Sequence, residues 1–155
     1  MKRRPENCPL CTTAAACARH DHPGLIADMG ESYAVLAETQ GCPGWCVLVL
    51  KAHVEHLAEL PLERQLGVWR DAARLAAAQR TVLNGRGASD GPVRINYACL
   101  GNVEPHVHIH LVPRHGDDPD PTGIPMSWPA DRQRGQLSDT QRAELVVRLR
   151  LAMGA

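Results

Sequence analysis

The sequence predicts an α+β domain in which an antiparallel sheet packs against one main helix and a C-terminal helix. Three observations lead to this fold class. Short apolar runs are separated by turns that contain glycine and proline, which favours strands joined in sequence. A long central stretch repeats apolar residues at helical spacing, and a second helix-like stretch ends the chain. Such a mixture of strands and helices is typical of an antiparallel α+β domain.

Four strands are expected. The run WCVLVL at residues 45–50 is continuously apolar, which is typical of a strand buried on both faces. The GCPG sequence before it is typical of the turn of a hairpin. The other three strands are expected at residues 32–39, 93–100 and 106–112.

The main helix is expected over residues 61–83. Pro61 suits its start, because the first N–H of a helix has no intrahelical partner. Asn84-Gly85 supplies a plausible stop signal. Helical spacing predicts that one stripe of this helix is buried, made of Leu62, Leu66, Trp69, Ala73 and Ala76.

The last helix is expected over residues 138–153. Ser138 and Gln141 stand three positions apart, which is a capping-box pattern. The buried side of this helix should contain Leu145, Val146 and Leu149.

No linker or internal repeat divides the chain, so residues 1–155 are expected to form a single domain. Residues 1–23 are expected to be irregular, and residues 115–137 to form a proline-rich loop.

Composition argues against several classes of protein. The chain has 17 basic and 17 acidic residues, so no excess charge points to nucleic acid. Three Trp, two Tyr and no Phe are too few to build a base-stacking platform. Apolar runs are far too short to span a bilayer. Polar residues and prolines interrupt the segment after the basic Lys2-Arg3-Arg4, so we expect no signal peptide and a cytoplasmic protein.

The chain contains six cysteines, two of which form a motif. Cys8 and Cys11 have C-x-x-C spacing, which predicts metal binding or redox chemistry. A redox motif would need a thioredoxin-like βαβ context, which is absent, so zinc with two further ligands is favoured. Two reduced cysteines near a flexible terminus are the alternative. Cys46 and Cys99 lie in apolar runs and are expected to be buried.

Residues 105–115 read PHVHIHLVPRH, with three histidines at alternate positions. Side chains alternate between the faces of a strand, so His106, His108 and His110 should share one face, away from the core. Neighbouring histidines in this row should be about 6.5–7 Å apart, so one phosphate-sized group can contact all three. A metal cluster, which His53 or His56 could join, is the main alternative. A solvent-facing polar row is the third.

The histidine pattern resembles the H-φ-H-φ-H-φ-φ signature of histidine triad (HIT) proteins, which are nucleotide hydrolases and nucleotidyl transferases. Residues 44–53 (GWCVLVLKAH) are similar to the Gly-x-x-Leu-φ-φ-x-Lys-x-His strand of this family. Residues 93–96 resemble its strand with a phosphate-contacting asparagine. Pro113-Arg114 resembles the branch that acts on dinucleoside polyphosphates. The resemblance implies a HIT-like sheet and homodimers that pair their main helices and strands.

The resemblance also implies roles for individual residues. His108 would attack the α-phosphorus of a nucleotide, since imidazole, with an ordinary pKa of about 6.5, is nucleophilic near neutral pH. Water or another acceptor would then resolve the nucleotidyl-histidine intermediate. Candidate donors to the phosphate oxygens are His110, Asn96 and Asn102, and Arg114 is a candidate contact for outer phosphates.

A zinc site is implied in the same way. Some bacterial HIT proteins, and the related galactose-1-phosphate uridylyltransferases, bind zinc through an N-terminal C-x-x-C, a histidine after the Lys-x-His strand and the first triad histidine. The matching residues are Cys8, Cys11, His53 and His106. Weaker candidate ligands are His20, His22 and His56.

The segment before the triad departs from the family pattern. Many members read Gly-Gln-[Ser/Thr]-Val-x-His, whereas residues 101–106 read GNVEPH. Asn102 is a shorter amide, Val103 lacks the hydroxyl that would help the leaving group, and Glu104 is an unexpected neighbour for an anion. Two alternatives therefore stay open. One is a zinc-dependent hydrolase whose histidines surround a metal-bound water, and the other is a nucleotide-binding regulatory module with little turnover.

Overall fold

The structure is an antiparallel sheet flanked by helices, as the sequence predicts, but the sheet has five strands where four were expected. It is a computed structural model that describes residues 7–84, 94–118 and 120–154. The strand order is β1-β2-β3-β5-β4, and every neighbouring pair is antiparallel. The strands are Leu25–Asp28 (β1), Ser32–Leu36 (β2), Cys46–Leu50 (β3), Arg94–Ala98 (β4) and His108–Arg114 (β5). Three predicted features lie outside the described residues: the helix stop at Gly85, the strand start at Val93 and the irregular residues 1–6.

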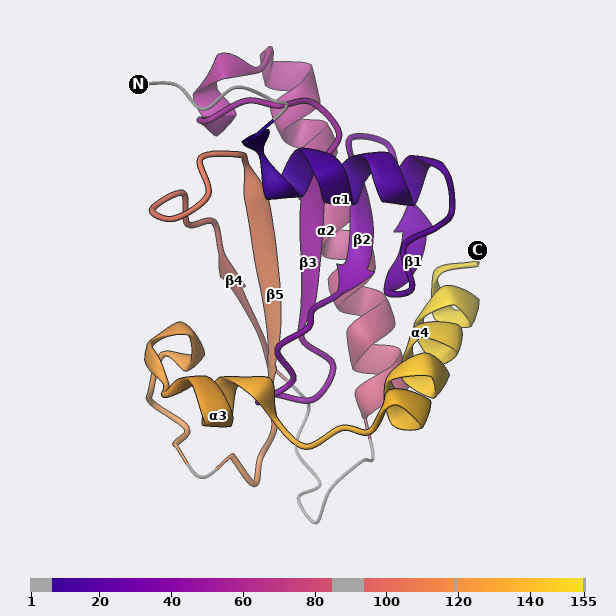
Figure 1. The fold of residues 1–155 in the computed structure, drawn as a ribbon, viewed down its shortest axis with the longest axis vertical. Coiled ribbons are helices and arrows are strands. Elements are labelled where there is room, and N and C mark those ends of the chain that lie inside the picture. Colours follow the sequence, from indigo (N-terminus) through magenta and orange to yellow (C-terminus); the bar gives the residue numbers. More distant parts are fainter. Residues whose placement is uncertain (1–6, 85–93, 119, 155) are drawn as a thin grey trace.

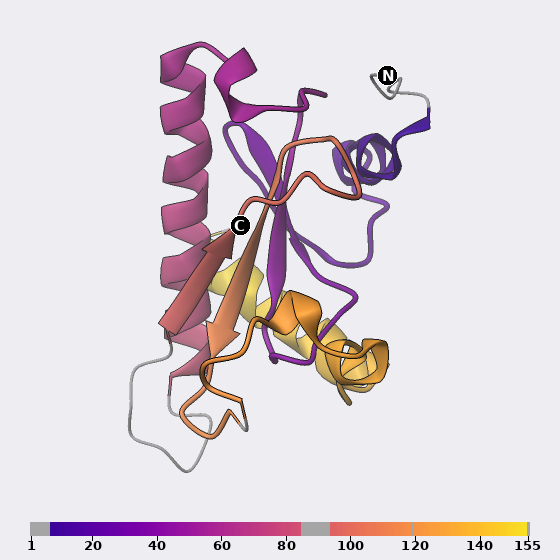
Figure 2. The same ribbon diagram turned by 90° about the vertical axis from the view of Figure 1, so that its left-hand side faces the viewer.

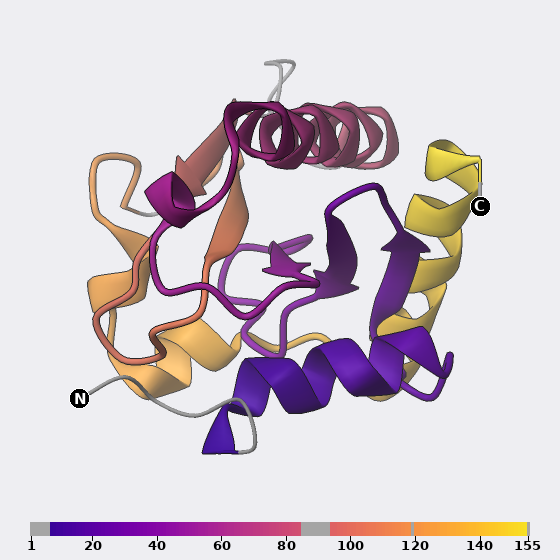
Figure 3. The ribbon, with the colours of Figure 1, turned by 90° about the horizontal axis from the view of Figure 1, so that it is seen from above.

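Helices cover the two faces of the sheet differently. The long helix α2 (Leu62–Leu83) crosses one face, and α4 (Asp139–Met153) packs against α2 and β1. The other face is crossed at one end by α1 (Pro9–Ala18), and the short α3 (Ala130–Arg134) lies toward the other end (Figure 1). Figures 2 and 3 show α1 and α2 on opposite sides of the strands. We call the α1 side the second face.

Strand alternation divides the buried side chains into two clusters. The cluster under α2 receives Val107, Ile109 and Leu111, as predicted, and includes the predicted Leu145, Val146 and Leu149 of α4. The cluster on the second face receives Tyr33, Val35, Val47, Val49 and Val112, with Ala14 and Cys17 of α1. His108 and His110 alternate with the first set and therefore share the second face with Val112.

The predicted stripe of the main helix is mostly wrong. Leu62, Leu66 and Trp69 are 66%, 48% and 45% exposed, and Ala73 is exposed too; only Ala76 of the five is buried. The helix meets the sheet through a neighbouring face, made of Val68, Ala72, Leu75, Ala76, Ala78, Val82 and Leu83. Both stripes have helical spacing, so periodicity alone does not say which one packs on the sheet.

The N-terminal segment is not irregular, because residues 9–18 form α1. The sequence PLCTTAAACA is rich in alanine, which has the highest helix propensity, and proline suits its first turn. The short strand β1 was also not predicted; its LIAD sequence becomes a strand through pairing with β2. In the loop at 115–137, Pro125–Ser127 forms a 3-10 turn (η3) before α3.

The strand ends differ from the prediction at two functionally relevant places. β5 begins at His108, so His106 lies in the approach to the strand, where its side chain is buried. β4 ends at Ala98, which leaves Cys99 exposed, whereas Cys46 is buried as predicted. Among the described residues, no helix combines the length and apolar character needed to cross a membrane.

Candidate functional site

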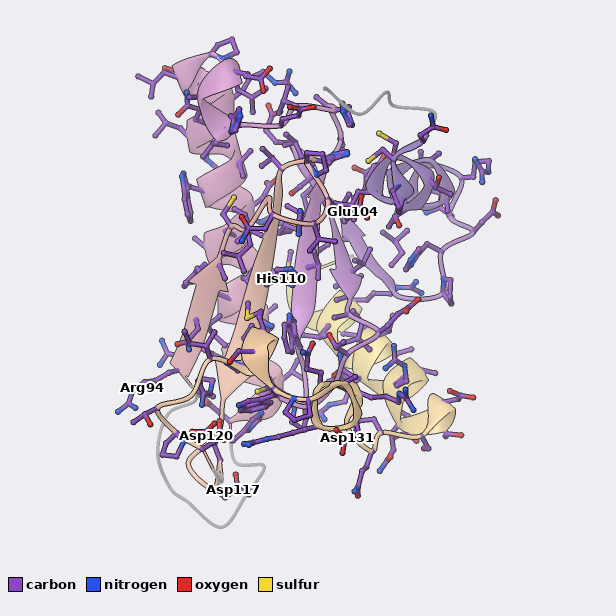
Figure 4. All side chains as sticks on the ribbon, turned by 60° about the vertical axis from the view of Figure 1, so that its left-hand side comes forward. Arg94, Glu104, His110, Asp117, Asp120 and Asp131 are labelled. Atoms are coloured by element: carbon purple, nitrogen blue, oxygen red, sulfur yellow. The ribbon has the colours of Figure 1, made fainter. Side chains whose placement is uncertain are left out.

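His108 and His110 lie side by side on the second face of the sheet. Across the β3–β5 pair, His108 stands opposite Val49 and His110 opposite Val47. The two imidazole centroids are 5.0 Å apart, and the ring planes are inclined at 78°. Both side chains are half-buried, and Figure 4 shows His110 midway along β5. One small anion can therefore contact both rings.

Hydrogen bonding fixes which nitrogen of His108 is available for chemistry. Its Nδ1 lies 2.7 Å from the backbone carbonyl oxygen of His106. A carbonyl oxygen only accepts, so Nδ1 must carry the proton. In the neutral ring the lone pair is then on Nε2. His108 thus presents an unprotonated nitrogen, as a nucleophile or metal ligand requires.

The opposite tautomer is fixed at His110. Its Nδ1 lies 3.1 Å from the indole Nε1 of Trp45. The indole N–H only donates, so Nδ1 accepts and the proton of the neutral ring is on Nε2. Burial, followed by the nearby His108, lowers the pKa of His110 to about 4. At neutral pH His110 is therefore an uncharged hydrogen-bond donor.

Trp45 belongs to this site, although its sequence pattern predicted only a buried strand. It is 2% exposed, and its ring meets His110 edge-on at 5.7 Å between centroids. The turn that delivers it is tight: Gly44 has φ +91°, and a Cβ there would lie 2.6 Å from Leu83 Cδ1. The Gly-Trp pair is visible in the sequence. Its reach across β3 to His110 depends on the pairing of β3 with β5, which the sequence does not specify.

The two predicted asparagines lie in different places. Asn96 stands opposite Val112 in the β4–β5 pair, so it shares the second face with the histidines. Asn102 is exposed in the loop before the triad and lines a cavity of about 300 Å³ together with His56 and His106. Val103 beside it is 82% exposed. The structure therefore brings Asn96 to the histidine face, and Asn102 only to His106.

Arg114, the predicted contact for outer phosphates, is held by the loop that follows β5. Its guanidinium donates to the Asp118 carboxylate at 2.7 Å and to the carbonyl oxygens of Asp120 and Gly123 at 2.6 and 2.8 Å. Its side chain is only 9% exposed. Arg114 thus holds the loop that follows β5. A Pro-Arg pair at a strand end does not reveal which acceptors the folded loop will offer.

The four predicted metal ligands converge at the N-terminal end of α1. The donor atoms of Cys8, Cys11, His53 and His106 all lie within 4.8 Å of one another. Nδ1 of His106 is 3.4 Å from Cys8 Sγ and 3.5 Å from Cys11 Sγ. Nδ1 of His53 is 3.2 Å from Cys11 Sγ. His20, His22 and His56 are not members of this cluster.

The donor set fits a tetrahedral zinc ion. Zn–S and Zn–N bonds of about 2.3 and 2.0–2.1 Å place sulfur and nitrogen roughly 3.5 Å apart at tetrahedral angles. The observed distances of 3.2–3.5 Å match this value. His106 is also oriented for the role, because its Nε2–H donates to the Leu50 carbonyl oxygen at 2.8 Å and leaves Nδ1 toward the sulfurs. Burial lowers the pKa of His106, which keeps Nδ1 unprotonated.

Comparison with known proteins agrees with this geometry. The HIT domain family matches residues 23–117 of the chain. A histidine triad protein from Marinobacter aquaeolei VT8 is 21% identical, with a TM-score of 0.68 over 84% of this chain and 88% of that one. A Zn-bound histidine triad family protein from Mycobacterium smegmatis is 21% identical, with a TM-score of 0.63 over 97% and 96%.

A third similar structure is that of a hydrolase. The Plasmodium falciparum diadenosine triphosphate hydrolase in complex with Cyclomarin A is 17% identical, with a TM-score of 0.61 over 86% of this chain and 78% of that one. At these identities the three likenesses establish the fold. No curated protein sequence matches the chain with significance.

Replacing Trp45 with Phe should raise the pKa of His110 above about 4, because Nδ1 loses a donor that opposes its protonation, while burial and His108 still hold the pKa below the ordinary ~6.5. The depressed pKa makes His110 a source of stability above about pH 6.5 that is lost as pH falls toward 4. The free energy of unfolding of Trp45→Phe should therefore fall less than that of the wild type as the pH is lowered from about 6.5 toward 4. Histidine NMR titration and urea unfolding measure both effects. Trp69→Phe on the exposed side of α2 is the control, and an unchanged His110 titration in Trp45→Phe would contradict the assignment.

Proposed function

This chain belongs to the histidine triad (HIT) family, and we propose that it is a nucleotide hydrolase or nucleotidyl transferase that cleaves an α-phosphate linkage through a nucleotidyl-histidine intermediate. One observation carries the proposal. Two adjacent histidines have opposite tautomers, so that an unprotonated Nε2 on His108 stands beside a protonated Nε2 on His110. A nucleophile next to an uncharged donor suits attack on a phosphate group.

The proposed reaction has two displacements at phosphorus. In the first, the Nε2 lone pair of His108 forms a bond to the α-phosphorus, and the leaving group departs with the electron pair of its own bond and takes up a proton from solvent. His110 Nε2–H and the Asn96 amide donate to the non-bridging oxygens. In the second, water attacks phosphorus, loses a proton to solvent and returns the electron pair to His108. Another acceptor in place of water gives transfer.

We further propose that Cys8, Cys11, His53 and His106 hold a structural zinc ion. The donor distances and the orientation of His106 support this role. Four protein ligands complete a tetrahedral zinc site and leave no open position for water, unlike a catalytic site. This donor set therefore gives no support to the alternative of a zinc-dependent hydrolase. Because the cluster requires reduced thiols, we propose a cytoplasmic location.

A homodimer is proposed from the surface that the fold leaves uncovered. Leu62, Leu66 and Trp69 form an exposed apolar stripe on α2. The adjacent β4 is an edge strand, and Tyr97 on it is 47% exposed. An uncovered strand edge beside an apolar stripe is a typical interaction surface. Pairing two copies through β4 and α2 would cover both features and continue the sheet.

His108→Ala should abolish turnover of any accepted nucleotide, since it removes the nucleophile of the proposed intermediate, while the fold stays intact by circular dichroism. The assay is mass spectrometry of protein quenched with a panel of labelled nucleoside phosphoramidates and dinucleoside polyphosphates. The wild type should carry a nucleoside monophosphate on His108. Tight nucleotide binding by the wild type without product or adduct would instead identify a regulatory module.

Zinc should co-purify at about one ion per chain and should be lost in Cys8→Ser/Cys11→Ser, because thiolates are its strongest ligands here. Inductively coupled plasma mass spectrometry measures the ion, and thermal unfolding should show a lower midpoint for the variant. Cys99→Ser, which removes an exposed thiol outside the cluster, is the control. Full zinc retention in the double variant would refute the site.

Leu66→Glu/Trp69→Glu should convert a dimer into a monomer, because two charges in each copy would have to be buried without partners. Sedimentation equilibrium measures the mass of both forms. Val147→Glu replaces an exposed apolar residue on α4 and should leave the mass unchanged. A wild-type chain that sediments as a monomer at every concentration would rule the dimer out.

A further inference from the structure

We infer that Gln79, a buried side chain of α2, is a positioning residue for the proposed reaction. Its amide ties the backbone that delivers Trp45 to the backbone of β5 beside His110, and so holds the indole of Trp45 on Nδ1 of His110. The inference rests on the proposed function and adds to it a residue from the opposite side of the sheet. Gln79 would act only through this contact, not by touching the substrate.

The side chain of Gln79 is fully buried between α2 and the sheet. Its exposed fraction is 0%, and α2 lies on the side of the sheet away from α1 (Figures 2 and 3). Its Nε2 donates to the carbonyl oxygen of Gly44 at 2.8 Å and to that of Leu111 at 3.1 Å. Gly44 directly precedes Trp45, and Leu111 directly follows His110. One amide therefore joins the two chain segments whose side chains meet on the second face.

Strand pairing alone does not make this link. The β3–β5 ladder ends at the pair Cys46–Leu111, so Gly44 and Trp45 lie beyond its end. The two carbonyl oxygens that Gln79 contacts are both acceptors, and two acceptors cannot bond to each other. A primary amide nitrogen carries two hydrogens and can serve both acceptors at once. Gln79 thus extends the connection between the two segments past the end of the ladder.

The other backbone groups around Trp45 are satisfied within its own turn. The buried amide of Gln40 accepts from the Gly44 N–H at 2.9 Å and donates to the Trp45 carbonyl oxygen at 2.9 Å. The Trp45 N–H donates to the carbonyl oxygen of Cys42 at 3.0 Å. These bonds join residues of one turn and shape it, but they do not connect it to β5. The contact from Gln79 to the Gly44 carbonyl oxygen makes that connection.

Gln79 is costly to bury, which argues that its donors are needed. Its Oε1 is buried and has no hydrogen-bond partner within the described part of the chain. A buried acceptor without a partner destabilises the fold, whereas an apolar side chain of similar size would leave no such acceptor. Its nearest neighbours on the buried face of α2 are apolar: Leu75, Ala76, Val82 and Leu83. The two donors of Nε2 are therefore what distinguishes this position.

The consequence for the reaction follows from the tautomer of His110. Its proton is fixed on Nε2 because Nδ1 accepts from the Trp45 indole. If the turn moves away from β5, Nδ1 loses this donor, and a neutral ring can place its proton on either nitrogen. Fewer molecules then offer a donor to the non-bridging oxygens of the phosphate. Because such a donor matters most in the transition state, its loss should lower kcat rather than raise KM.

The test compares two variants of Gln79 with a matched control, all in the full-length protein. Gln79→Met keeps the length of the side chain and removes both donors. Gln79→Glu keeps its shape and retains one donor, because burial raises the pKa of a carboxyl group and so keeps it protonated. Val82→Ala removes buried apolar volume about one turn further along α2 and leaves the amide in place. The control therefore reports the effect of lost core packing alone.

Heteronuclear NMR of the side-chain nitrogens measures the tautomer without any substrate. In the wild type at neutral pH, His110 should show an unprotonated Nδ1 and a protonated Nε2, and the Trp45 indole N–H should show the shift of a hydrogen-bonded donor. Gln79→Met should move both His110 nitrogens toward the values of a mixture of tautomers and should shift the indole signal. Gln79→Glu should lie between these two, and Val82→Ala should match the wild type.

Steady-state kinetics measures the effect on the reaction, with whichever labelled nucleotide forms the adduct on His108. Gln79→Met should lower kcat by on the order of tenfold or more, with little change in KM, because a catalytic group is misplaced and not removed. Val82→Ala should show a lower midpoint of thermal unfolding but the kcat of the wild type. Loss of stability and loss of positioning are thereby measured separately.

Unchanged His110 and Trp45 signals in Gln79→Met would overturn the inference, and so would equal shifts in Val82→Ala. If Gln79→Met does not fold, Gln79→Glu decides by the same criterion. Hydrogen exchange in the wild type gives a further check that needs no variant. The side-chain NH2 of Gln79 should exchange far more slowly than that of Gln141, which is exposed, and equal rates would overturn the inference as well.

The same measurements separate this inference from the proposed function. No turnover of any nucleotide by the wild type would reject the proposed function. The NMR comparison would still decide whether Gln79 holds Trp45 on His110. Turnover by the wild type with an unchanged kcat in Gln79→Met would instead leave the proposed function standing and overturn the role of Gln79.

Discussion

His106 connects the parts of this structure on which the site depends. Its Nε2–H donates to the Leu50 carbonyl oxygen at the end of β3, and its Nδ1 faces the sulfurs of Cys8 and Cys11. Its own carbonyl oxygen accepts from Nδ1 of His108. One residue therefore links the cysteine pair of α1, the central strand and the tautomer of the neighbouring histidine. A metal ion at the cluster would stiffen the approach to β5 and, with it, the ring of His108.

Other elements cover the second face of the sheet at both ends, and the histidines lie between these covered ends. α1 with the cysteine–histidine cluster covers one end, and Trp128 is buried at the other. Trp128 donates its indole N–H to Asp120 and lies under the guanidinium of Arg132, while Arg114 holds the same loop. The charged groups of this loop therefore pair with one another beside the site.

Local patterns predicted the features that depend on residues close together in the sequence. Alternation along residues 106–112 gave the core face of β5, and the motif resemblance gave all four members of the cysteine–histidine cluster. The sequence did not reveal which of two apolar stripes of α2 meets the sheet, because both have the same period. It also did not reveal Trp45 or the fate of Arg114. Those contacts join residues 65 positions apart in one case and loop acceptors in the other, so only the folded chain brings them together.

The segment before the triad and the loop after β5 differ from what the family pattern predicts around the phosphates. Val103 stands where that pattern has a hydroxyl, and its side chain is 82% exposed. The guanidinium of Arg114 is held by Asp118 and by two backbone carbonyl oxygens. His110 and Asn96, by contrast, share the second face with His108. They are therefore placed to donate to a phosphate that would be bound to His108.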